Sequence, residues 1–130
     1  MVVKVKDVMV NDVVTVDAMA PLVDALELMF AKSVKSLVIL PRNEHDAFGI
    51  LTFRDIARKV IAGNEQIDML NVFDLMNKPC YNVHEELDIR YAAKKMTDMS
   101  VSRLLVTRGN TLVGIVSLTD LVKSLVKNNS

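Results

Sequence analysis

The sequence predicts an α/β (α+β) fold made of two copies of one β-α-β-β-α unit. Two observations support this prediction: the 130-residue chain aligns with itself along most of its length, and each half closes with the same motif. The motif is a glycine, two aliphatic residues, a hydroxyl residue and, three positions later, an aspartate. It occurs as Gly49-Ile50-Leu51-Thr52-Phe53-Arg54-Asp55 and as Gly114-Ile115-Val116-Ser117-Leu118-Thr119-Asp120. Such an internal repeat is typical of a fold assembled from equivalent units.

The self-alignment sets the expected boundaries of the repeats. Asp7 falls on Asp74 and, after a two-residue insertion in the first copy, Asp55 falls on Asp120. We therefore expect repeat 1 at residues 5–62, a linker at 63–71 and repeat 2 at 72–127. A unit of about 60 residues buries too little surface to be more than marginally stable alone. We expect the two repeats to pack together about a pseudo-two-fold axis.

The elements of the first repeat are predicted from the spacing of apolar residues and from residues that typically begin or end a helix. A β-branched run predicts a strand, and apolar residues at helical spacing after Pro21 predict a helix, since proline is accepted in the first turn. Gly63 is a typical C-terminal helix stop. The predicted order is a helical turn (residues 6–9), a strand (13–16), a helix (22–30), two strands that form a hairpin (36–40 and 47–52) and a helix (54–62).

The second repeat shows the same order. The linker carries three apolar residues, Ile67, Met69 and Leu70, which predict a short packed element. The elements predicted after it are an extended segment (residues 80–83), a helix (87–99), two strands (103–107 and 111–117) joined by a tight turn (108–110), and a final helix (118–127).

Composition excludes several classes of protein. Sixteen basic and sixteen acidic residues give zero net charge, whereas a nucleic-acid surface needs a basic stripe. Cys80 is the single cysteine, so no intrachain disulfide or thiolate metal cluster is expected. No apolar run approaches the ~18 residues of a membrane span, and the charged N-terminus does not resemble a signal peptide. We expect a cytoplasmic protein with no membrane partner.

The closing motifs have two compatible interpretations. Ser117 ends a predicted strand and Asp120 lies in the first turn of the next helix, where N–H groups and the helix dipole favour anions. A carboxylate there can accept hydrogen bonds from a ribose diol, and a hydroxyl can donate to phosphate. The same spacing is that of a helix capping box. Thr52 and Asp55 repeat the arrangement.

The paired repeats, the Asp7-Val8-Met9 opening and both closing motifs resemble the CBS (cystathionine-β-synthase) domain pair, or Bateman module, over almost the whole chain. The resemblance implies two clefts between the repeats that bind adenosine-containing ligands, such as AMP, ADP, ATP or S-adenosylmethionine. It implies a regulatory function that needs no cofactor and signals to an unknown effector protein. It also implies a homodimer formed through the helices.

The resemblance also implies binding residues. Asp55 and Asp120 would hold the ribose hydroxyls. The other implied positions are Thr52 and Ser117 for ribose or phosphate, Arg54 and Thr119 beside the aspartates, Lys35 and Arg103 for phosphate, and Thr15, Ser36, Leu37, Asn82, Arg103 and Leu104 beside the base. At equivalent positions the first repeat has Arg54 and Thr15, whereas the second has Thr119 and Asn82. We therefore expect the two sites to differ, and we expect the site around Asp120 to bind adenosine better.

Catalysis is not expected. His45 lies in a predicted polar turn and His84 just before a predicted helix, which are typical surface positions. The sequence contains no P-loop and no paired-histidine motif. The alternative to a ligand sensor is a dimerisation or interaction module of the same fold with no nucleotide bound.

Overall fold

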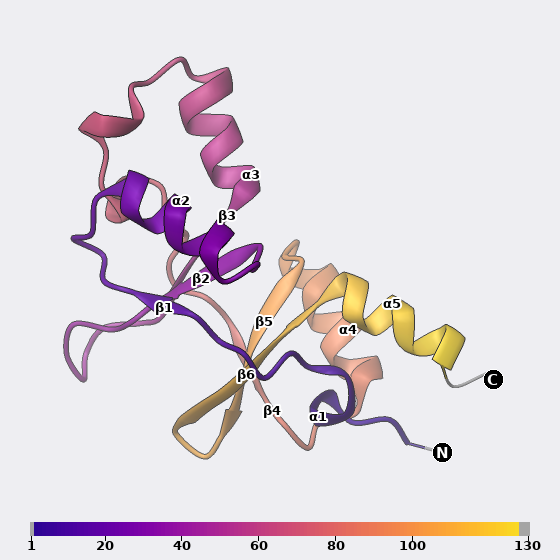
Figure 1. Ribbon diagram of the computed structural model, residues 1–130. Coiled ribbons are helices and arrows are strands. Elements are labelled where there is room, and N and C mark those ends of the chain that lie inside the picture. Colours follow the sequence, from indigo (N-terminus) through magenta and orange to yellow (C-terminus); the bar gives the residue numbers. More distant parts are fainter. Residues whose placement is uncertain (1, 128–130) are drawn as a thin grey trace. The chain divides into compact units, whose positions relative to one another are not determined.

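A computed structural model, which describes residues 2–127, confirms the mixed fold and the two repeats (Figure 1). The elements before the second repeat are α1 (Val5–Val8), β1 (Thr15–Val16), α2 (Leu22–Ala31), β2 (Ser36–Ile39), β3 (Gly49–Thr52), α3 (Phe53–Ile56), the π-helical turn η1 (Ala57–Ala62) and the 3₁₀ turn η2 (Ile67–Met69). The later elements are the 3₁₀ turn η3 (Val72–Asp74), β4 (Asn82–His84), α4 (Ile89–Met99), β5 (Arg103–Arg108), β6 (Thr111–Ser117) and α5 (Leu118–Lys127).

Each repeat forms its own three-stranded sheet, in the order β1-β2-β3 or β4-β5-β6. In both sheets the first strand pairs in parallel with the second, and the second pairs antiparallel with the third. The central strands supply the cores: Leu37 of β2 and Leu104 of β5 are both fully buried. The predicted hairpins are confirmed, and the tight turn of the second contains Gly109 with a φ of 60°.

The apolar spacing predicts most of the buried face of α2, although Phe30 at its end is 67% exposed. Helix α2 buries Leu22, Ala25 and Met29, which lie on one face because a helix repeats every 3.6 residues. Helices α2 and α4 are each followed by a serine in the left-handed conformation, Ser33 (φ 55°) and Ser100 (φ 56°). These serines are equivalent in the two repeats, so both copies turn from helix to hairpin in the same way.

Several predicted boundaries differ from the structure by one or two residues. The second repeat's helix begins at Ile89 and not at residue 87, because the Asp88 side chain caps it by accepting the Arg90 N–H over 2.9 Å. The helix after β3 begins at Phe53, one residue before its predicted start, and beyond Ile56 it widens into the π-helical turn η1, which ends at Ala62 as predicted. The predicted packed element of the linker is η2, where Ile67 and the following Leu70 pack against the first core, whereas Met69 is 74% exposed and not packed as predicted.

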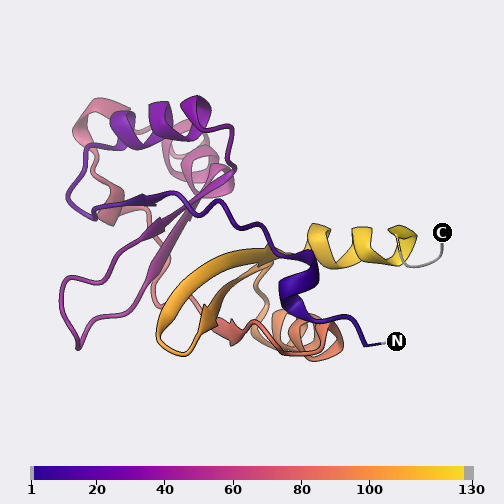
Figure 2. The ribbon, with the colours of Figure 1, turned by 60° about the horizontal axis from the view of Figure 1, so that its bottom comes forward.

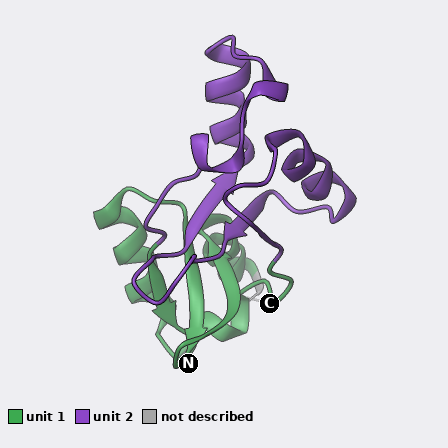
Figure 3. Cartoon of the chain, turned by 90° about the vertical axis from the view of Figure 1, so that its left-hand side faces the viewer, with its two compact units in different colours: residues 1–13, 81–130 green, residues 14–80 purple. Residues whose placement is uncertain are grey.

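The compact units do not coincide with the sequence repeats. One unit is Val14–Cys80, and the other combines the residues before Val14 with those from Tyr81 onward, as Figure 3 shows in purple and green. Helix α1 accordingly lies among the elements of the second repeat (Figure 2). Val5 is fully buried in that repeat's core, and Val72 is fully buried in the core of the first.

Equivalent backbone hydrogen bonds secure both of these crossing segments. The Val5 N–H donates to the Leu87 carbonyl over 2.8 Å, and the Val72 N–H donates to the Ala20 carbonyl over 2.9 Å. The start of each repeat therefore completes the sheet unit of the other repeat.

Candidate functional site

A helix cap fixes one carboxylate at the end of each hairpin. In the first repeat the Thr52 N–H donates to Asp55 Oδ2 over 2.9 Å, and the Asp55 N–H donates to Thr52 Oγ1 over 3.4 Å. In the second, the Ser117 N–H donates to Asp120 Oδ2 over 2.8 Å, and the Asp120 N–H donates to Ser117 Oγ over 3.1 Å. The capping interpretation is confirmed at both motifs, and it holds each carboxylate at the junction between strand and helix.

The two carboxylates differ in their remaining partners. Asp55 is only 5% exposed. Its Oδ2 also accepts the Thr52 hydroxyl over 2.9 Å, and its Oδ1 accepts Asn77 Nδ2 over 2.9 Å and Arg58 Nη2 over 3.1 Å. Asp120 is half-buried, and among residues 2–127 only the N–H of its cap residue donates to it. A carboxylate has about four acceptor positions, so Asp55 is saturated by its own chain and Asp120 is not.

The hairpin register places a polar side chain beside each cap residue. Ser36 is the direct partner of Thr52 across the first hairpin, and Arg103 is the partner of Ser117 across the second. Directly opposed residues of an antiparallel pair have their side chains on the same face. Ser36, Thr52, Arg103 and Ser117 are all half-buried, so a ligand at the sheet edge can reach them.

The other predicted positions divide into exposed and buried groups. Successive residues of a strand face opposite sides, so Leu37 and Leu104 turn away from Ser36 and Arg103, and both are 0% exposed. Neither leucine therefore presents any accessible surface to a ligand in this structure. The predicted residues that are exposed are Thr15, Lys35, Arg54, Asn82 and Thr119.

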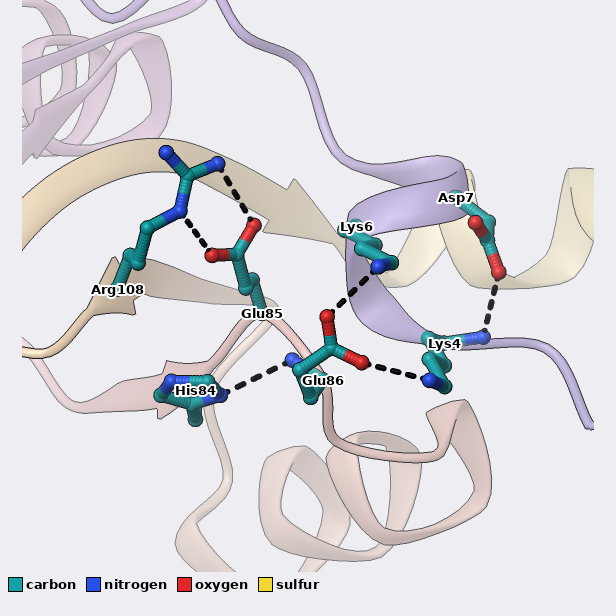
Figure 4. Close-up of polar contacts among 7 residues, drawn as sticks. All are labelled: Lys4, Lys6, Asp7, His84, Glu85, Glu86 and Arg108. Atoms are coloured by element: carbon teal, nitrogen blue, oxygen red, sulfur yellow. Dashed lines mark hydrogen bonds and ion pairs between the residues drawn. The ribbon is translucent and has the colours of Figure 1, made fainter.

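A separate charged cluster fastens α1 to the loop after β4 (Figure 4). Lys4 Nζ and Lys6 Nζ each lie 2.6 Å from a carboxylate oxygen of Glu86. Hydrogen bonds from these two ammonium groups lower the pKa of Glu86 to about 2. Arg108 donates to both oxygens of Glu85 and lowers the pKa of that carboxyl. Each carboxylate is thus matched by neighbouring cations, which indicates a structural role.

Both histidines are exposed, as predicted. His45 Nε2 lies 3.5 Å from a Glu44 oxygen, and His84 Nδ1 accepts the Glu86 N–H over 3.1 Å (Figure 4). Within the described residues no group of three or more His, Cys, Asp or Glu side chains is placed to hold a metal ion. No helix in that part of the chain has the length and apolarity needed to cross a membrane.

The CBS domain family model matches the chain twice, at residues 5–62 and 72–127. The chain belongs to the CBS domain family. As a tandem CBS pair it is a regulatory module, and each of its two CBS repeats corresponds to one three-stranded sheet.

Three proteins illustrate what this CBS pair is similar to. The uncharacterized protein MK0525 of Methanopyrus kandleri is 32% identical over 93% of this chain, which spans 62% of MK0525. The hexameric CBS-CP12 protein of bloom-forming cyanobacteria has a TM-score of 0.88 and 36% identity, covering 94% of this chain and 67% of that protein. The CBS pair of protein MJ0100, solved with 5′-methylthioadenosine and S-adenosylmethionine, has a TM-score of 0.77 and 25% identity, covering 95% and 99%.

Two residues at the first carboxylate were not predicted. Arg58 lies three positions after Asp55 on the same helix, a spacing that predicts an ion pair, so the sequence did contain this signal. Asn77 comes from the start of the second repeat, 22 positions away from Asp55. No local pattern links those two positions.

Proposed function

We propose that this CBS pair is a regulatory module that binds an adenosine-containing ligand at the half that contains Asp120. The observation that carries the proposal is the Asp120 carboxylate, which is fixed by its cap and retains open acceptor positions. The complex of the similar protein MJ0100 with 5′-methylthioadenosine and S-adenosylmethionine supports this ligand class.

The local chemistry suits a ribose with an attached anionic group. The two ribose hydroxyls donate to Asp120, and hydrogen bonds to a charged acceptor are the stronger class. Ser117 Oγ, the Arg103 guanidinium and the first turn of the ten-residue helix α5 supply donors and positive potential for a phosphate. The ligand regulates only to the extent that it binds one state of the module more tightly than another.

Calorimetric titration with AMP, ADP, ATP and S-adenosylmethionine tests the proposal. We expect one of them to bind, and Asp120→Ala to weaken its binding at least tenfold. The matched control is Asp7→Ala, because Asp7 accepts the Lys4 N–H over 2.9 Å in a cap of the same kind, within the same compact unit. Equal losses in both variants would show a general effect of destabilisation. No binding by the intact chain would favour the interaction module.

A specific observation also favours self-association. Helix α5 exposes an apolar stripe in which Leu118 is 45%, Val122 56% and Leu125 61% accessible, while it buries Ser124 at 3%. A helix that buries a serine and exposes leucines has a second apolar face available for a partner. The CBS-CP12 protein, which is 36% identical to this chain, is hexameric. We therefore propose that the chain forms a homodimer or larger homo-oligomer through α5.

Light scattering coupled to size exclusion tests this second proposal. Leu125→Glu should shift the chain toward monomer, because it places a charge on the apolar stripe of α5. Lys123→Glu introduces the same charge on an exposed position of α5 outside that stripe, and it should leave the mass unchanged. An intact chain that stays monomeric at ~100 µM would contradict self-association through α5, since stable dimers form well below that concentration.

A further inference from the structure

Asn77 and Val10 occupy equivalent places in the two sheet units. The Asn77 N–H donates to the Ile50 carbonyl over 2.9 Å, and the Ile50 N–H donates back over 2.9 Å. Val10 makes the same reciprocal pair with Ile115, over 2.8 and 3.0 Å. Ile50 and Ile115 are themselves equivalent residues of the closing motifs. The backbone at these two places is therefore the same, and the side chain is what differs.

This difference in side chain changes which hydrogen bonds the carboxylates of Asp55 and Asp120 accept. Asn77 Nδ2 donates to Asp55 Oδ1 over 2.9 Å, whereas valine has no side-chain donor. This bond completes the set of four that saturates Asp55. Asp120, whose unit has Val10 at the equivalent place, keeps its open acceptor positions within the described chain.

A ligand at the Asp55 half would have to displace a donor. Of the two donors to Oδ1, Arg58 has a side chain that is 67% exposed, so its ion pair is weakly held and easily exchanged. The Asn77 backbone is held by its two hydrogen bonds to Ile50, which keep the exposed Asn77 side chain beside Asp55, so the amide leaves Asp55 only by changing rotamer. Asn77 is thus the residue that keeps ribose hydroxyls from Asp55.

We propose that the residue at this position decides which half of the pair binds ligand: Asn77 closes the Asp55 half, and Val10 leaves the Asp120 half open. The proposal rests on the function proposed above and adds a stoichiometry of one ligand per chain. Asn77 acts here as a positioning residue, because it occupies the carboxylate and does not itself contact a bound ligand.

Reciprocal exchange of the two residues tests the proposal, with AMP, ATP and S-adenosylmethionine each titrated calorimetrically. The intact chain should bind one equivalent, which Asp120→Ala abolishes and Asp55→Ala leaves in place. Asn77→Val should add a second equivalent, and Asp55→Ala in that background should remove it. Val10→Asn changes a 43% exposed residue, so it should fold, and it should weaken the Asp120 site at least tenfold.

The outcomes separate this proposal from the function on which it rests. Closure by Asn77 would be overturned if the intact chain bound two equivalents of ligand, or if its single equivalent were lost in Asp55→Ala. It would also be overturned if Asn77→Val bound no more ligand than an intact chain that binds normally. Binding that appears only in Asn77→Val would support closure and overturn the Asp120 site. No binding by either chain would overturn both proposals.

Discussion

Alanine at Gly114 should destabilise the protein far more than alanine at Gly49, its equivalent in the first repeat. A Cβ at Gly114 would lie 2.6 Å from Met9 Sδ and 2.9 Å from the Val10 carbonyl oxygen. A Cβ at Gly49 would meet its nearest atom, the Asn77 carbonyl oxygen, at 3.3 Å. The N-terminal segment must therefore move to accept the first change, while small shifts accommodate the second.

The size of the loss in unfolding free energy can be worked out from the hydrogen bonds that this movement breaks. Displacing Val10 removes its two backbone hydrogen bonds to Ile115, each worth about 0.5–1.5 kcal/mol net. Overpacking costs about 1–3 kcal/mol more, and the lower entropy of the unfolded alanine chain returns about 0.4–1 kcal/mol. We expect Gly114→Ala to lower the free energy of unfolding by about 3 kcal/mol and Gly49→Ala to change it by less than about 1 kcal/mol.

Urea unfolding followed by circular dichroism measures both variants, and amide hydrogen exchange locates the damage. For a chain of this size we expect a melting temperature roughly 10 °C lower for Gly114→Ala. Exchange at the Ile115 amide should accelerate in that variant alone. Equal destabilisation by both changes, or an Ile115 amide that exchanges as slowly as in the parent, would refute the reasoning.

Three further predictions concern the cores, the caps and the charged cluster. Leu104→Ala should lower the free energy of unfolding by about 2–5 kcal/mol, because the fully buried side chain leaves a cavity; a smaller loss in urea unfolding would contradict its place in the core. Ser100→Gly should raise the unfolding free energy by about 0.5–1 kcal/mol, because glycine adopts the left-handed φ of 56° without a Cβ clash; a lower urea midpoint would contradict this. The pKa of Glu86 is lowered from 4.5 to about 2 in the folded chain, so its stabilising contribution is complete above pH 4.5 and is lost as the pH falls toward 2. Glu86→Gln should flatten the decline of the urea midpoint across that range, and an unchanged decline would exclude Glu86 as a source.

Local features of the fold were predictable, because they depend on residues close together in the sequence. The cap between Ser117 and Asp120 involves positions three apart, and each hairpin consists of two neighbouring strands joined by a short polar turn. The repeat added the long-range information that two such units exist. This is why the fold class and the capped carboxylates followed from the sequence.

The occupancy of the carboxylates and the composition of the compact units were not predictable in the same way. Asn77 reaches Asp55 because the chain returns to the sheet edge, and only the three-dimensional path shows this. Similarly, Val5 and Val72 look like ordinary first residues of their repeats, although each is buried in the core of the other repeat. Leu37 and Leu104 illustrate a related point, because position within a motif did not indicate that their side chains face the core.

The crossing of the N-terminal segment has a consequence for synthesis on the ribosome. The unit Val14–Cys80 is continuous in sequence, so it can fold as soon as it has emerged. The segment that carries Val5 is made first, yet its sheet is made last, after Tyr81. The segment that carries Val5 therefore waits without its sheet while the whole of the Val14–Cys80 unit is made.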